Sequence, residues 1–375
     1  MTWFVRYRWA VVAFVFLHAS CAVARETVVW EGKRTIDDVV KIVGKDLLLK
    51  PGAMVRFRGG GRIDLRDGSF TATNAAFFGD GVLTNAWRIC VVSGGLRLER
   101  CFLRGMKSVY PVKGQIWWCG SVMVQGSPVR IVDCKSVESS AIAVVNSKNA
   151  EVSRNVFDKC DPGLFAFQTV GGRFYKNEFF DCNGEALRAN AAQETEFADN
   201  RFTDCGKGIV NFAVRRCRFS GNSFFGGSAG IELWWNAVGN LFSANLFEDV
   251  KGSAFAVLRP LDADNVFANN VVSRCGSGWS LGKQKPKARI AIRDNVILET
   301  ANGIALAEGE ADAPNNAFWK VKTPVLTKDG AEVHTPKTVA ADPLFVDTAR
   351  GDYRLRPGSP LLNAGSSGSN IGIYP

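Results

Sequence analysis

Histidine is nearly absent from this chain, because its 375 residues include only two, His18 and His334. A metal site built mainly from histidines is therefore excluded, and a Ser-His-Asp triad is disfavoured. His18 also lies in a segment that we expect to be removed. Any catalyst in the mature chain would then have to rely on lysine, arginine, tyrosine or carboxylates.

Charged residues are fewer than hydrophobic ones, and zinc-binding patterns are absent. Charged residues make up 22% of the chain and hydrophobic residues 46%, a balance that excludes a disordered chain or a coiled coil. The ten cysteines include no Cys-x-x-Cys pair with zinc spacing, which disfavours structural zinc. After the first 24 residues, no apolar run is long enough for a transmembrane helix.

The first 24 residues have the pattern of a secretory signal peptide. Two arginines precede a short apolar core at residues 9–17, and small residues at 22–24 form a cleavage motif. We therefore expect residues 1–24 to be a signal peptide and the mature protein to be secreted or periplasmic. Anchoring as a lipoprotein at Cys21 is the alternative that the sequence supports less well.

The chain is basic, with a formal net charge of +10. Such a surface attracts polyanions, and outside the cell these are acidic polysaccharides more often than nucleic acid. The sequence therefore predicts an acidic polysaccharide as the partner and no nucleic acid. A charge excess that only keeps the protein in solution is the alternative.

A repeat runs through most of the chain. An Asn-x-Phe or Asn-x-aliphatic triplet recurs every 21 to 25 residues, and each is followed by a turn rich in Gly, Asp and Asn and by an alternating strand that begins with Ala or Gly. The triplets begin at Asn155, Asn177, Asn200, Asn222, Asn245, Asn270, Asn295 and Asn316.

Units this short cannot bury their apolar faces alone, so we expect them to stack as successive coils with parallel strands about 4.8 Å apart. The asparagines would then share amide hydrogen bonds along the stack, and the Phe residues would fill the interior. Cys160, Cys182 and Cys205 share one column, which predicts buried, unpaired thiols. A bridge between Cys101 and Cys134 stays open.

The repeat, together with segments near both ends, resembles the right-handed parallel β-helix proteins of the pectate-lyase-like superfamily. The opening segment 49–57 is similar to that family's first coil, and the segments 342–347 and 351–360 are similar to its closing region. The resemblance implies an all-β solenoid, a single-stranded right-handed parallel β-helix of about ten coils of 22–25 residues. It would span residues 25–318, followed by a closing segment at 319–375, and we expect a monomer.

Alternation along the strands predicts which side chains face outward on one sheet. The residues expected to contact substrate on this face are Phe165, Phe167, Asn190, Phe212, Trp234 and Trp235. Aromatic faces suit sugar rings, and interspersed cations suit sugar carboxylates. The alternative is that the segment 106–120 covers these aromatic side chains.

The resemblance implies polysaccharide chemistry without fixing the reaction, because the family includes lyases, hydrolases, epimerases and binding rods. β-Elimination from a uronic acid needs cations and a base, which arginine and lysine can supply. The residues expected to be catalytic are Arg188, Glu232, Arg259 and Lys283. We therefore rank a lyase first, and a non-catalytic rod or a glycoside hydrolase remains open.

Calcium is the one cofactor that the resemblance suggests, because some lyases of this superfamily hold calcium through outward Asn and Glu side chains. Here the candidate oxygen ligands are Asn190 and Glu232. No second outward acid accompanies Glu232 in these columns. For a hydrolase, Asp161 and Glu185 in the neighbouring turns are the nearest further acids.

Overall fold

The structure is a computed structural model of the chain. It describes residues 25–82, 87–107, 120–261, 264–284, 290–328 and 330–373. The expected signal peptide at 1–24 and nearly all of the 106–120 segment lie outside the described residues, so both expectations stay predictions.

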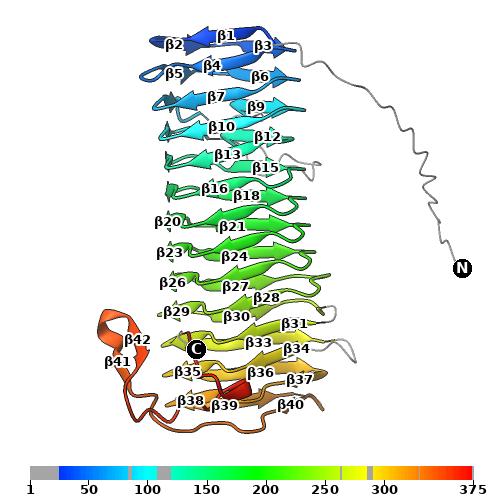
Figure 1. Cartoon of the computed structure of the whole chain (residues 1–375), viewed down its shortest axis with the longest axis vertical. Coiled ribbons are helices and arrows are strands. Elements are labelled where there is room, and N and C mark those ends of the chain that lie inside the picture. Colours follow the sequence, from blue (N-terminus) through cyan, green and yellow to red (C-terminus); the bar gives the residue numbers. More distant parts are fainter. Residues whose placement is uncertain are drawn as a thin grey trace, which may run out of the picture.

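The chain winds into a solenoid of three parallel sheets, which confirms the predicted all-β parallel β-helix (Figure 1). Sheet A consists of β1(Thr27–Trp30), β4(Asp46–Leu49), β7(Phe70–Thr73), β10(Leu96–Glu99), β13(Val129–Val132), β16(Glu151–Ser153), β19(Arg173–Tyr175), β22(Glu196–Ala198), β25(Arg218–Ser220), β28(Leu241–Ser243), β31(Asn265–Ala268), β34(Ile290–Arg293), β37(Glu310–Asp312) and β40(Glu332–His334). Sheet B consists of β2(Lys33–Ile36), β5(Met54–Phe57), β8(Ala76–Phe78), β11(Phe102–Arg104), β14(Lys135–Val137), β17(Val156–Asp158), β20(Glu178–Phe180), β23(Arg201–Thr203), β26(Ser223–Phe225), β29(Leu246–Glu248), β32(Val271–Ser273), β35(Val296–Leu298) and β38(Ala317–Trp319). Sheet C consists of β3(Val39–Val43), β6(Arg62–Arg66), β9(Ile89–Val92), β12(Val122–Gln125), β15(Ile142–Val145), β18(Leu164–Phe167), β21(Glu185–Asn190), β24(Lys207–Phe212), β27(Ala229–Leu233), β30(Ser253–Val257), β33(Ser277–Lys283), β36(Asn302–Glu308) and β39(Thr323–Thr327).

The solenoid is longer than the repeat indicated. In the described part of the chain, sheet C alone has 13 strands, where about ten coils were expected. The predicted number of coils was low because the coils before Asn155 lack the Asn-x-Phe triplet that marks the repeat, although the predicted β-helix did begin at residue 25. At the other end, β39 and β40 continue the sheets past residue 318.

The asparagine column forms the predicted ladder at the bend between sheets A and B. The Nδ2 group of Asn155 donates to Oδ1 of Asn177 at 2.9 Å, and Asn177 donates to Asn200 at 3.0 Å. The same contact recurs down to Asn316, where Asn295 donates at 2.9 Å. Each Oδ1 also accepts a backbone N–H of the preceding coil, so the ladder satisfies buried polar groups that the bend leaves without sheet partners.

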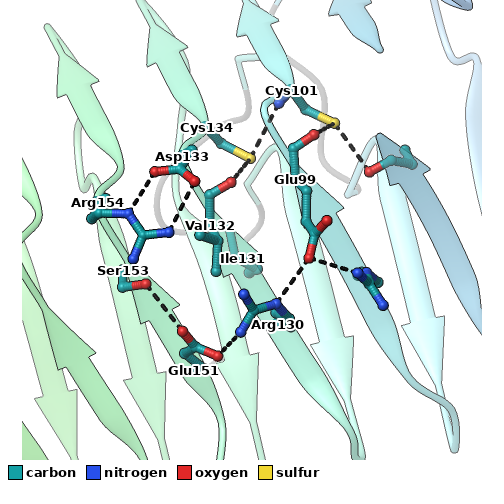
Figure 2. A network of polar contacts seen from close by, with 12 residues as sticks. Glu99, Cys101, Arg130, Ile131, Val132, Asp133, Cys134, Glu151, Ser153 and Arg154 are labelled. Carbon is teal, nitrogen blue, oxygen red and sulfur yellow. Dashed lines mark hydrogen bonds and ion pairs between the residues drawn. The ribbon is translucent and has the colours of Figure 1, made fainter. Parts of the chain in front are cut away.

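Two cysteines begin this same column, which the sequence did not reveal. The backbone N–H of Cys134 donates to Oδ1 of Asn155 at 2.9 Å. The backbone N–H of Cys101 donates to Sγ of Cys134 at 3.4 Å (Figure 2). Both are free thiols in this structure. The predicted interior column of Cys160, Cys182 and Cys205 is likewise buried and unpaired.

Stacked phenylalanines fill the interior, as predicted. One column runs from Phe157 to Phe247 with ring centroids 4.6 to 4.8 Å apart, close to the strand spacing. A second column runs from Phe174 to Phe267 at 4.8 to 5.1 Å. These columns form a rigid support beneath the outer face of the sheets.

The C-terminal segment, residues 341–373, folds back along the outer face of sheet B (Figure 1). It contains the antiparallel pair β41(Phe345–Asp347) and β42(Asp352–Leu355) and the short 3-10 helices η1(Thr348–Arg350) and η2(Ser366–Gly368). Buried residues at the contact are Leu246, Val271, Val296, Leu298 and Ala317 of sheet B, with Phe345, Tyr353, Leu361 and Ile371 of the segment. Within the described residues, no helix is long and apolar enough to cross a membrane.

Candidate functional site

The outer face of sheet C brings the two central predicted residues onto one column. Arg188 in β21 pairs in register with Val210 in β24, which pairs with Glu232 in β27. The residues before and after them, such as Leu187 and Leu233, point into the core, as the alternation predicted. Two strand spacings therefore separate Arg188 from Glu232.

Both charged side chains are largely enclosed, contrary to a fully exposed face. The side chains of Arg188 and Glu232 are only 11% and 9% exposed. Nε of Arg188 lies 3.0 Å from Oε2 of Glu185, and Nζ of Lys207 donates to Oε2 of Glu232 at 2.9 Å. Each predicted residue thus has a partner of opposite charge that precedes it on the same or the adjacent strand.

The partners come from a column that the sequence analysis did not place on the sheet, because Glu185 was expected in a turn and Lys207 was not considered. Glu185 in β21 pairs in register with Lys207 in β24, and each stands just before the Ala or Gly at which the strands were expected to begin. The strands begin one residue earlier than expected, so these side chains join the sheet. Their position immediately before Ala186 and Gly208 was the signal available in the sequence.

Burial raises the pKa of the Glu185 carboxyl group, and Arg188 and Lys207 offset the shift only in part. The neighbouring carboxylates of Glu232 and Asp161 raise the Glu185 pKa further. The Glu185 carboxyl group therefore holds its proton to a higher pH than an exposed glutamate does.

Asp161 comes from the turn before β18 and lies against the adjacent coil. Asp161 as a whole residue is exposed, but its carboxyl group turns toward Gly184. A Cβ atom added at Gly184 would lie 2.1 Å from Oδ1 of Asp161. Burial of this group raises the Asp161 pKa, and a hydrogen bond from the backbone of Glu185 opposes the shift. Only glycine at position 184 allows this approach.

These groups line a pocket of about 370 Å³. Its lining residues are Asp161, Pro162, Asn183, Gly184, Glu185, Gly206, Lys207 and Ser228. The volume lies in the range of small-ligand sites, and the pocket combines two carboxyl groups with one ammonium group. We call the pocket together with Arg188 and Glu232 the acid pocket.

An aromatic cluster lies at the other end of the same strands. The rings of Phe212 and Trp234 stack with centroids 5.2 Å apart, and Trp235 meets both edge-on at 5.6 and 5.8 Å. Cζ of Arg188 lies 4.7 Å from the Phe212 ring centroid, which links the cluster to the acid pocket. Trp235 is 46% exposed and presents the most accessible ring, whereas Phe212, Trp234 and the adjacent Asn190 are half-buried.

The remaining predicted residues lie apart from the acid pocket. Phe165 is buried and packs against Phe167, with ring centroids 5.8 Å apart, so its ring is not on the accessible face as expected. Arg259 is exposed after the end of β30. Lys283 pairs with Glu308 at 2.6 Å, two strands beyond Glu232, so neither cation reaches Arg188.

Asn190 and Glu232 do not fit a shared calcium site. Asn190 pairs in register with Phe212, and Glu232 lies one strand beyond that, so two strand spacings, about 9.6 Å, separate the two residues. Calcium needs several oxygens at about 2.3 to 2.6 Å each, and the Glu232 carboxylate already bonds to the Lys207 ammonium group. Within the described residues, no group of three or more His, Cys, Asp or Glu side chains is placed to hold a metal ion.

Comparison with known proteins agrees with the architecture. The family model described as a right handed beta helix region matches residues 115–247 and 210–318, which together cover more than half of the chain. The chain belongs to the right-handed β-helix family. No curated protein matches the sequence of this β-helix protein significantly.

Several solved structures are similar to this β-helix protein at low sequence identity. An alginate lyase, AlyF-OU02 in complex with G6, has a TM-score of 0.51 at 11% identity, covering 93% of this chain and 90% of that chain. A family 28 exopolygalacturonase of Yersinia enterocolitica has a TM-score of 0.45 at 10% identity, covering 76% and 73%. A polygalacturonase from Erwinia carotovora ssp. carotovora has a TM-score of 0.44 at 10% identity, covering 78% and 97%.

Proposed function

We propose that this protein hydrolyses the glycosidic bonds of an acidic polysaccharide at the acid pocket. The observation that carries the proposal is the position of Glu185, whose pKa is raised by burial, in the lining of the pocket beside Lys207, which bonds to Glu232. Hydrolysis requires one carboxylic acid that donates a proton and one carboxylate that remains charged. The enclosed Glu185 suits the first role and the ion-paired Glu232 the second.

Lys207 connects the two acids, because its ammonium group bonds to Glu232 and lowers the pKa of Glu185. The backbones of the acids are two strands apart, and Glu232 stands three residues farther along its strand than the residue in register with Glu185. Inverting hydrolases hold such a pair of carboxyl groups far enough apart to leave room for an attacking water molecule. Glu185 would protonate the leaving oxygen while Glu232 activates that water.

Two features support an acidic substrate. Arg188 and Lys207 place two cations at the acid pocket, and the chain as a whole carries a net charge of +10. Cations favour carboxylates through charge-assisted hydrogen bonds, and the exposed Trp235 ring offers a face for a sugar.

β-Elimination, the reaction expected from the sequence, is the second candidate. The same two cations favour it, because elimination requires neutralisation of a uronate carboxylate. It ranks second because Glu185, whose raised pKa suits a proton donor, is not suited to be the base that elimination requires.

Product chemistry distinguishes these reactions. The purified protein is incubated with polygalacturonate, alginate, a glycosaminoglycan and a neutral glucan, and new reducing ends and the ultraviolet absorbance of unsaturated uronate are followed. We expect reducing ends to rise on an acidic polymer without new absorbance. Rising absorbance would replace hydrolysis with elimination, and retention of the protein on immobilised glycan without any product would identify a binding rod.

A further inference from the structure

The outer face of sheet C differs on the two sides of the acid pocket. Toward the N-terminus, the column of Arg188 continues through Phe165, Ala143, Met123 and Cys90. Toward the C-terminus, the column of Glu232 continues through Ala256, Ser280, Ala305 and Leu326. The first side is covered, whereas the second opens from Ser280 onward, beyond the buried Ala256.

The N-terminal side is closed although its side chains point away from the core. Ala143 is 0% exposed and Phe165 6%, and with Ala141 they form an apolar cluster outside the solenoid. Partly buried side chains packed against this cluster are Trp87, Met123, Val145 and Phe167. We call these seven residues the apolar wall.

The apolar wall spans the whole width of the sheet. Ala141 adjoins the start of β15, Ala143 lies in its middle, and Val145 stands at its end. The indole of Trp87 packs over Gly120, where an added Cβ atom would lie 2.5 Å from Cζ3. A ligand held at Arg188 therefore meets packed side chains along the full edge that faces the N-terminus.

The C-terminal side has a floor of small side chains. Ser280 and Ala307 are exposed, and Ala305 is half-buried. A hollow of about 180 Å³ lies over this floor, and its lining includes Ser280, Ala305, Ala307, Leu326 and Lys328. From β27 to β39 the face extends over four strand spacings, about 19 Å, which leaves room for several sugar units.

We infer that a polysaccharide chain can leave the acid pocket in one direction only, over Ser280 and Ala305 toward Lys328, with its terminal unit against the apolar wall. This inference rests on the proposed function and deepens it, because it makes the protein an enzyme that shortens chains from one end. Lys328 would meet an anionic sugar farther along the chain.

The products of a time course test the inference. The expected result is one small product of constant size from the first minutes, with a slow loss of polymer viscosity. A fast fall in viscosity with oligosaccharides of mixed length would overturn the inference and leave the proposed function standing. Absence of product from every polymer would instead refute the proposed function.

Variants test the path itself. Ser280→Trp places a bulky side chain on the open floor and should raise KM several-fold for long chains but not for the shortest substrates. Lys41→Trp, on the same outer column beyond the apolar wall, is the matched control and should change neither. Equal effects of the two variants would contradict a one-sided path.

A third variant opens the closed side. Trp87→Ala should increase the share of internal cleavage, whereas Phe78→Ala, which removes a half-buried aromatic ring from the outer face of sheet B, should not. An unchanged product pattern in Trp87→Ala would contradict the inference that the apolar wall blocks the polysaccharide on this side. If no polymer is cleaved, retention on immobilised polysaccharide gives the same comparison, and equal retention of Ser280→Trp and Lys41→Trp would overturn the inferred path.

Discussion

Enclosure determines what each charged side chain of the acid pocket can do. Glu185 is surrounded by protein and by two further carboxylates, whereas Glu232 bonds to an ammonium group at 2.9 Å. Two residues of one chemical type therefore have different surroundings, one enclosed with a raised pKa and one bonded to a cation, and such differences let carboxyl pairs divide acid and base roles.

The pH dependence of the reaction follows from the raised pKa of Glu185. A general acid must hold its proton, so activity should be lost as the pH rises through that pKa. Asp161→Asn removes a carboxylate that raises the Glu185 pKa, so the alkaline limb of the kcat profile should move to lower pH. A limb that stays in place in this variant would contradict the assignment of Glu185.

The contribution of Glu185 to folding stability should likewise fall as the pH rises. Because burial raises the pKa of Glu185 in the folded state, its contribution is present in full below the unfolded pKa and is lost as the pH rises through the folded one. The Glu185–Arg188 ion pair opposes this loss only in part.

Arg188 and Glu232 could be predicted because alternation along a strand identifies outward residues. From the sequence, Glu185 was placed in a turn and Lys207 was not considered, because the bend before sheet C ends one residue earlier than the Ala or Gly signal suggests. Phe165 was expected to be accessible because alternation along a strand shows only which way a side chain points. It does not show what packs over that side chain, and Trp87, which packs against the cluster of Phe165, is far away in sequence.

At the scale of single elements, the bends depend on the asparagine ladder. Asn222→Ala would leave the buried backbone N–H of Asn200 without its acceptor, and Nδ2 of Asn200 would keep only the Phe174 carbonyl oxygen of its two acceptors. We expect a loss of about 1 to 3 kcal/mol in the free energy of unfolding, measured by chemical denaturation. Ser223→Ala, one residue later and facing outward, should change it by less than about 0.5 kcal/mol.

The strands and bends were predictable because successive repeats place the same residue types at equivalent positions. The ladder, the Phe columns and the Cys column all followed from residues in equivalent positions. The start of the ladder could not be predicted because Cys101 and Cys134 occupy the ladder position in the earlier coils, and a thiol gives no asparagine signal.

At the scale of the whole molecule, the C-terminal segment acts as a brace along sheet B. Leu361 is fully buried against it, and Oδ1 of Asp294 accepts hydrogen bonds from the N–H and Oγ groups of Ser366 at 2.7 and 3.0 Å. The acid pocket lies on a different sheet, so the brace and the site are separate.

Leu361→Ser should therefore loosen the brace without altering the acid pocket. We expect faster proteolytic cleavage within 341–373 and a lower Tm, with kcat unchanged. The exposed Leu362→Ser is the matched control and should leave proteolysis nearly unaffected. Loss of kcat in Leu361→Ser at a temperature where it stays folded would connect the brace to the site and contradict this separation.

The proposal that Glu185 is the proton donor of a hydrolase is tested most directly by one rate measurement. Reducing ends released from the best acidic polymer are counted for the native protein, Glu185→Gln and the exposed control Glu178→Gln. The expected result is a loss of about a hundredfold or more in kcat for Glu185→Gln and no change for Glu178→Gln. Native activity in Glu185→Gln, with the fold intact, would contradict the account.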